Sequence, residues 1–246
     1  MSALVRLRNV DLRYPSSRIQ PASIKELLLA PFRRRRTTPP VHALRGIDLE
    51  VEPGDRLGIV GRNGAGKSTL LRVMAGVYPI DSGEIEVNGR IHALFDLSLC
   101  FEYEATGRQN IYYRSYLMGH APSAVAEREA EIAGFADLGE FIDYPVKTYS
   151  AGMLVRLAFS ISTAMEGDLL LLDEVLGAGD AAFAAKAARR MEDVIRSSRA
   201  LVLVSHDLEA VRRFCRRCIV LEEGRIGFSG DVEPALARYR GAAGAA

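Results

Sequence analysis

Residues 61–69 have the sequence Gly61-Arg62-Asn63-Gly64-Ala65-Gly66-Lys67-Ser68-Thr69, which fits the phosphate-loop pattern G-x-x-x-x-G-K-[ST]. The apolar residues 56–60 before it indicate a short buried strand, and residues 69–75 indicate the start of a helix. Glycines let the backbone curl so that its N–H groups point at phosphate oxygens, and the helix N-terminus adds its dipole. We expect Lys67 to reach the outer phosphates and Ser68 to hold magnesium. The stretch therefore predicts a nucleotide-phosphate site.

Composition and charge are ordinary for a globular protein. The chain has 246 residues, is 48% hydrophobic and carries a formal net charge of +1, so net charge gives no reason to expect a nucleic-acid partner. No run approaches the roughly 20 apolar residues that span a bilayer, and the N-terminus lacks a signal region, so we expect a cytoplasmic protein. Cys215 and Cys218 have C-x-x-C spacing, but no second pair completes a zinc site, which favours incidental packing.

The patterning predicts one domain over residues 1–246 with two interruptions. Residues 15–40 form a basic insertion with a short predicted helix followed by four arginines, Arg33–Arg36. The arginines fit equally well a solvated loop or docking at an anionic membrane surface. Residues from about 100 to 165 carry helical periodicity and predict a helical subdomain. The Gly-Ala tail 241–246 is expected to be flexible.

Two acidic residues follow a strand that is predicted to be buried on both faces. The apolar run 169–172 leads directly into Asp173 and Glu174, and ligands bind at the carboxyl ends of strands in open α/β sheets. We expect Asp173 to hold magnesium beside Ser68, commonly through water. Glu174 is a candidate general base or water-orienting group for hydrolysis, and the alternative is a surface carboxylate at a strand end.

Two further side chains have both a functional and a structural interpretation. His206 follows the predicted buried strand 200–204. It could hydrogen-bond a γ-phosphate and fix the attacking water, although a lone histidine is more often structural. Tyr14 ends the alternating strand 5–14, where ordinary strand packing and stacking on a nucleotide base are equally compatible with the sequence.

A second anion-binding pattern lies far along the chain. Tyr149-Ser150-Ala151-Gly152-Met153 opens the helix that starts at Leu154. In order and spacing, five motifs together resemble a nucleotide-binding subunit of an ABC transporter, and the resemblance covers nearly the whole chain. The motifs are the phosphate loop, Tyr149 to Met153, Leu172-Asp173-Glu174, Gly177-Ala178-Gly179-Asp180 and Val204-Ser205-His206-Asp207.

Within that family the chain is similar to the ATPase subunits of exporters for O-antigen, capsule or teichoic-acid polymers. The residues that carry this narrower resemblance are Thr106-Gly107-Arg108-Gln109-Asn110-Ile111, Lys147 to Met153, Arg156-Leu157-Ala158-Phe159, Asp173-Glu174-Val175-Leu176 and Gly179-Asp180-Ala181-Ala182-Phe183, with the basic insertion after Tyr14. The resemblance implies an α/β fold: a P-loop NTPase core sheet, an antiparallel β portion and an inserted helical signature subdomain.

The resemblance also implies roles for residues and partners. Two copies would face head to tail, with ATP and Mg2+ bound between the phosphate loop of one copy and Ser150, Gly152 and Met153 of the other. Tyr14 would stack on adenine. The sequence departs from the common pattern in two places. The signature is Ser-Ala-Gly-Met in place of Ser-Gly-Gly-Gln, and Asp96 stands where most members have glutamine, near magnesium and the transmembrane partner.

The resemblance therefore implies an ATPase that drives export of a lipid-linked polysaccharide through a separate polytopic transmembrane permease. The chain would lie peripherally at the cytoplasmic face of the inner membrane. The alternative is a soluble ABC ATPase acting on nucleic acid or the ribosome. Such proteins usually carry two cassettes, a coiled coil or a zinc module, and the sequence contains none of these, so we expect no nucleic-acid partner. A P-loop kinase is a further alternative, but it would explain neither the second anion-binding pattern nor His206.

Overall fold

The computed structural model describes residues 2–15, 40–95, 101–173 and 181–243. Most of the basic insertion, both Asp96 and Glu174, and the last three residues lie outside these ranges, so the expectations about them stay predictions. Among the described residues, no helix is both long and apolar enough to cross a bilayer. The last helix extends to Ala243, three residues into the tail that was expected to be flexible.

Three strands form a small antiparallel sheet in the order β2 (Val41–Val51), β1 (Val5–Tyr14) and β4 (Ser82–Val87). Buried and exposed side chains alternate along β1, and this alternation shifts by one residue between Leu7 and Val10, where Asn9 has a positive φ of 46°. Such a bulge lets Val5 and Leu7 before it, and Val10 after it, all face the core.

The larger sheet has six strands in the order β5 (Ile91–Leu94), β6 (Leu169–Asp173), β7 (Ala200–Val204), β3 (Arg56–Gly61), β8 (Arg217–Glu222) and β9 (Arg225–Asp231). All neighbouring strands are parallel except β8 and β9, which form an antiparallel hairpin. The carboxyl ends of β6, β7 and β3 consequently lie next to one another at one edge of the sheet.

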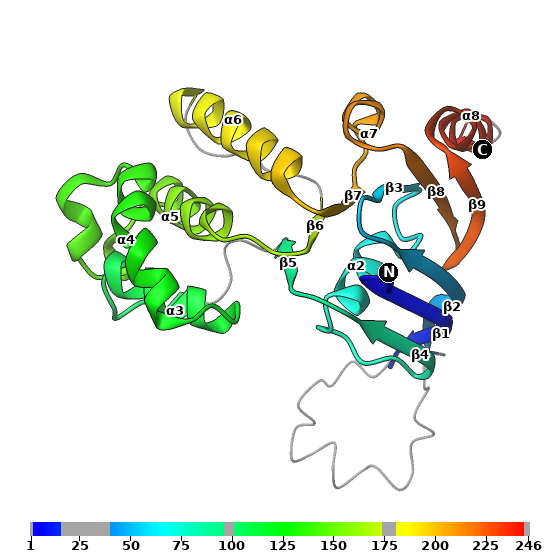
Figure 1. Ribbon diagram of the computed structural model, residues 1–246, viewed down its shortest axis with the longest axis horizontal. Helices are drawn as coiled ribbons and strands as arrows, with labels where there is room; N and C mark the ends of the chain where they lie inside the picture. The colour runs from blue at the N-terminus through cyan, green and yellow to red at the C-terminus, as the bar shows by residue number, and fades with distance from the viewer. Residues whose placement is uncertain (1, 16–39, 96–100, 174–180, 244–246) are drawn as a thin grey trace, which may run out of the picture.

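Helices and the small sheet cover the two faces of the larger sheet (Figure 1). Helix α2 (Lys67–Met74) and the antiparallel sheet pack on one face, and the helices α6 (Ala181–Ser197), α7 (Leu208–Phe214) and α8 (Val232–Ala243) pack on the other. Within β6, Leu169 and Leu171 enter the first core and Leu170 and Leu172 enter the second. This burial on both faces explains why β6 reads as a continuous apolar run.

The helical subdomain forms a lobe of its own at the left of Figure 1. It consists of α3 (Gly107–Leu117), α4 (Pro122–Ala136) and α5 (Ala151–Ala164), with the short 3-10 helices η2 (Gly139–Asp143) and η3 (Val146–Thr148) before α5. Three aromatic rings join the lobe to the rest of the molecule. Phe159 of α5 stacks on Phe135 of α4 at 6.0 Å between centroids and meets Phe183 of α6 edge-on at 5.9 Å.

Replacing Phe159 by alanine is expected to lower the free energy of unfolding by about 3–5 kcal/mol, because the ring is fully buried and its removal leaves a cavity between the lobe and α6. Urea denaturation followed by circular dichroism measures the loss. Leu117→Ala is the matched control, since this side chain is 73% exposed and should change stability by no more than about 0.5 kcal/mol. Equal losses in the two variants would contradict the packing described for Phe159.

Candidate nucleotide-binding site

The phosphate loop curls between β3 and α2 because its glycines adopt conformations and contacts that other residues cannot. Gly64 and Gly66 have positive φ values of 79° and 104°. A Cβ on Gly66 would lie 2.6 Å from the carbonyl oxygen of Ala43, and a Cβ on Gly61 would lie 2.4 Å from that of Leu221. The backbone is thus pressed against two neighbouring strands, as only glycine permits at these positions.

Lys67 lies across the inside of the loop. Its side chain is buried, and its ammonium Nζ donates to the carbonyl oxygens of Gly61 at 2.8 Å and Arg62 at 3.1 Å. The N-terminus of α2 has no side-chain cap and no acidic residue in its first turn. Its first amides and the positive end of its dipole are therefore available to an anion.

A cavity of about 630 Å³ opens in front of the loop, within the size range of small-molecule sites. It brings together the loop, the carboxyl ends of β6 and β7, and the end of β1. The sequence-predicted residues that line it are Tyr14, Asn63, Gly64, Gly66, Lys67, Ser68, Thr69, Asp173 and His206. Residues that lie far apart in the chain thus share one cavity. The other loop residues, Gly61, Arg62 and Ala65, line an adjoining cavity of about 860 Å³ together with β8, β9 and α8.

The oxygens at the cavity suit a magnesium ion that is held partly by phosphates. Ser68 offers a hydroxyl and Asp173 a carboxylate, and both side chains are partly exposed. Within the described ranges, no group of three or more His, Cys, Asp or Glu side chains could hold a metal ion alone. Magnesium commonly uses one or two carboxylates and completes its shell with phosphate oxygens and water. The residues present therefore fit the ion in company with a nucleotide.

Tyr14 is positioned by two contacts at the wall of the cavity. Its hydroxyl lies 3.0 Å from Thr69 Oγ1, and its ring meets Tyr78 edge-on, at 5.9 Å between centroids and 88° between planes. The ring is half-buried. These contacts show that Tyr14 packs within the fold. Tyr14 also lines the cavity, and stacking of its ring on a base is a proposal.

His42 lines the cavity, although no sequence pattern predicted a role for it. It lines the same wall as Tyr14, and its Nε2 lies 2.6 Å from Asp11 Oδ1. The hydrogen bond with His42 lowers the pKa of the Asp11 carboxyl. The antiparallel pairing of β1 with β2 places Tyr14 opposite Val41 and Arg13 opposite His42. The sequence could have indicated His42 only if the pairing of β1 with β2 had been known, because that pairing is what brings His42 beside Tyr14.

The second predicted anion site lies at the N-terminus of α5, and its residues are not brought to the phosphate loop of the same chain. Ser150 caps the helix by accepting from the backbone N–H of Met153 at 3.3 Å. Ser150 and Gly152 are exposed, whereas Met153 packs partly against the helical subdomain. Ser150, Gly152 and Met153 do not line the 630 Å³ cavity. They form a separate helix terminus that faces solvent.

Cys215 and Cys218 are buried thiols between α7 and β8. Burial raises the pKa of each to about 12, so the reactive thiolate is scarce near neutral pH. Both sulfur atoms lie close to the position that a Cβ on Gly58 of β3 would take. The two thiols therefore fill space between α7 and the sheet, as the sequence predicted, and nothing among the described residues around them supports a redox role.

The fold matches known ATP-binding cassettes. A dimeric ATP-binding cassette in a post-hydrolysis state bound to ADP and phosphate superposes with a TM-score of 0.67 at 20% identity, over 93% of this chain and 99% of that chain. The ATP-binding subunit of an ABC transporter gives 0.68 at 18% identity, over 97% and 93%. These likenesses confirm the expected fold: a P-loop core sheet, an antiparallel β portion and an inserted helical subdomain.

Sequence relatives are named for polymer export. An O-antigen export system ATP-binding protein of Yersinia enterocolitica is 39% identical over 92% of this chain and 97% of that protein. Another O-antigen export system ATP-binding protein, from Myxococcus xanthus, is 42% identical over 85% of this chain. A teichoic acids export ATP-binding protein of Bacillus cereus is 35% identical over 98% of this chain. The chain spans about half the length of these last two relatives, 48% and 43%.

The profile of the ABC transporter family matches residues 44–177, more than half of the chain. As its five motifs predicted, this chain belongs to the ABC transporter family.

Proposed function

We propose that the chain is the ATP-hydrolysing subunit of a system that exports a lipid-linked polysaccharide through a separate transmembrane permease. The observation that carries the ATPase assignment is the single cavity where Lys67, Ser68, Asp173 and His206 meet at adjoining strand ends. The polymer-export assignment is supported by the relatives, which are named for O-antigen and teichoic-acid export. The alternative of an ATPase acting on nucleic acid would be supported by salt-dependent RNA or DNA binding of the purified protein.

Phosphoryl transfer to water depends mainly on positioning and electrostatic stabilisation. The amides of the loop and the ammonium of Lys67 bind and orient the outer phosphate oxygens. Ser68 and Asp173 would hold magnesium, which neutralises charge that develops on the phosphates. Glu174 follows Asp173 in the chain and is proposed to orient the attacking water and to accept its proton as the general base. His206 donates a hydrogen bond to the γ-phosphate.

A second copy of the chain completes the proposed site. The N-terminus of α5 is capped and exposed but does not reach the cavity of its own chain. A Cβ on Gly152 would have only Ser150 Oγ nearby, at 3.9 Å, so a phosphate can approach the backbone here. In a head-to-tail pair, Ser150, Gly152 and Met153 of one copy would close over the γ-phosphate held by the other. The similar solved cassette is itself dimeric.

The permease places the chain at the membrane. Relatives are named as parts of export systems, which implies a transmembrane partner. We propose that the chain is peripheral to the cytoplasmic face of the membrane through this partner, and that Asp96 lies near the contact. The four arginines Arg33–Arg36 would add attraction to anionic lipid.

Glu174→Gln is expected to lower ATP turnover by at least about a hundredfold, because the amide cannot serve as a base for water. ATP binding and ATP-driven dimerisation should persist, since phosphate binding rests on Lys67 and the loop. Phosphate release assays and size-exclusion chromatography with ATP measure the two properties. Full hydrolytic activity in this variant would contradict the role assigned to Glu174.

Lys67→Ala is expected to weaken ATP binding by about tenfold to a hundredfold, because hydrogen bonds to charged groups contribute about 1.5–3 kcal/mol. Titration of a fluorescent ATP analogue measures the affinity. Lys147→Ala removes a lysine that pairs with Glu104 in the helical subdomain at 2.6 Å and serves as the control, with unchanged affinity of the monomer. An unaltered affinity in Lys67→Ala would contradict the proposed placement of the phosphates.

Neutralising Arg33 to Arg36 with glutamine is expected to impair polymer export more than basal ATPase activity, because the arginines are proposed to act at the lipid surface. Export is measured as surface polymer in cells that depend on this chain, and ATPase activity on the purified protein. An equal loss of both would indicate a role in folding instead.

A further inference from the structure

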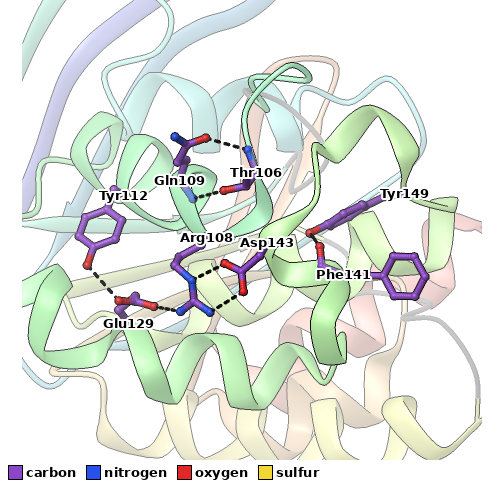
Figure 2. Close-up of polar contacts among 8 residues, drawn as sticks. All are labelled: Thr106, Arg108, Gln109, Tyr112, Glu129, Phe141, Asp143 and Tyr149. Atoms are coloured by element: carbon purple, nitrogen blue, oxygen red, sulfur yellow. Dashed lines mark hydrogen bonds and ion pairs between the residues drawn. The ribbon is translucent and has the colours of Figure 1, made fainter.

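The start of α3 is fastened to the segment that leads into α5. Thr106 caps α3, with its side chain accepting from the N–H of Gln109 and the Gln109 side chain accepting from the N–H of Thr106 (Figure 2). The backbone N–H of Gly107 donates to the carbonyl oxygen of Tyr144 at 3.3 Å, and that of Val146 donates to Ala105 at 2.9 Å. The first turn of α3 therefore lies directly against residues 144–146, which run toward the signature segment Ser150–Met153.

Arg108 joins three elements at this contact. Its Nε and Nη2 donate to the two oxygens of Asp143 in η2 at 2.7 and 3.1 Å, and its Nη1 donates to Glu129 of α4. Tyr112 of α3 donates its hydroxyl to the other oxygen of Glu129 at 3.1 Å. The hydrogen bonds to Asp143 and Glu129 raise the pKa of Arg108, and the bond from Arg108 lowers the pKa of Asp143. A planar guanidinium shared in this way fixes orientation as well as distance.

The network is partly exposed, so it contributes less to stability than to geometry. The side chain of Arg108 is 41% exposed and that of Asp143 is 59% exposed. Ion pairs in such positions are screened by solvent and add little to the free energy of folding. A directional fork between α3, α4 and η2 nevertheless holds these elements at set angles, which apolar packing alone does not do.

Tyr149 lies between η2 and the cap of α5. Its side chain is buried, and its hydroxyl donates to the carbonyl oxygen of Phe141 in η2 at 2.6 Å. A Cβ on Gly107 would lie 2.2 Å from that hydroxyl oxygen and 3.0 Å from the carbonyl oxygen of Ile142. Gly107 therefore packs directly against the Tyr149 hydroxyl, and Tyr149 immediately precedes the helix cap Ser150.

We propose that Arg108 is a positioning residue for the signature segment: through Asp143 and η2 it sets the place of Tyr149, and Tyr149 sets the direction of the first amides of α5. The inference rests on the proposed function, in which these amides close over the γ-phosphate held by a second copy. Hydrogen bonds to a phosphate oxygen depend steeply on distance and angle, so a small rotation of this terminus weakens closure. The phosphate loop lies outside the network and keeps its own affinity for ATP.

The test uses the full chain with Glu174→Gln, in which hydrolysis does not obscure binding. Adding Arg108→Ala is expected to raise the ATP concentration for half-maximal dimerisation by about tenfold or more. The affinity of the monomer for a fluorescent ATP analogue and the melting temperature should stay unchanged. Arg196→Ala is the matched control, because it removes an exposed arginine that pairs with Glu192 on α6 at 2.6 Å. It should leave dimerisation unchanged.

Two further substitutions test the contact between Gly107, η2 and Tyr149 directly. Gly107→Ala is expected to impair ATP-driven dimerisation by pushing on the Tyr149 hydroxyl. Tyr149→Phe is expected to impair it as well, because this change removes the hydrogen bond to Phe141 through which η2 holds Tyr149. If Arg108→Ala shifts dimerisation no more than Arg196→Ala, or if Tyr149→Phe leaves dimerisation unchanged, the inference is overturned. If Ser150→Ala and Gly152→Val also leave dimerisation intact, the proposed closure by the signature fails with it.

Discussion

The close approach of backbone to backbone around the phosphate loop is the constraint on which the rest of the site depends. Gly61 at the end of β3 faces the carbonyl oxygen of Leu221 in β8, and Gly66 faces that of Ala43 in β2. Gly224, in the turn of the β8–β9 hairpin, faces the same Ala43 oxygen, and its N–H donates to Ala65 at 3.0 Å. No side chain could fit at these positions. The loop therefore joins the central sheet to the antiparallel sheet, and its glycines serve packing as well as phosphate binding.

Strand register then places the chemistry around the loop. Ile59 of β3 pairs with Val204 of β7, and Val204 pairs with Asp173 of β6. These three residues lie at one level of the sheet, so the loop, Asp173 and the segment that carries His206 all leave the strands at the same edge. A shift of one residue in β6 would leave leucines in both cores, but it would carry Asp168 or Asp173 to a level of the strand that a buried leucine now fills. The hydrophobic cores thus set the position of the functional residues.

The features that the sequence predicted are those with local signals. The phosphate loop and the buried strands β6 and β7 depend on residues within a few positions of one another, and the structure has each of them. The helix that was expected from Leu154 begins three residues earlier, at Ala151, with Ser150 as its cap. The pair of His42 with Asp11 depends on the pairing of β1 with β2, which includes a bulge at Asn9 that no local pattern announces. The contact of Gly107 with Tyr149 likewise joins distant positions. Glu174 and Asp96 stay predictions, because they lie outside the described residues.

The two anion-binding ends of the chain rest on supports of different kinds. The phosphate loop is held by backbone contacts within the sheets, so its shape does not depend on the helical lobe. The N-terminus of α5 is held by a directional network within the lobe, and the lobe joins the sheets in part through the apolar contact of Phe135, Phe159 and Phe183. Apolar packing fixes contact but is non-directional, whereas bidentate hydrogen bonds fix angles. In the proposed dimer, ATP would therefore lie between two anion-binding ends that are supported independently of each other, one by the sheets and one by the lobe.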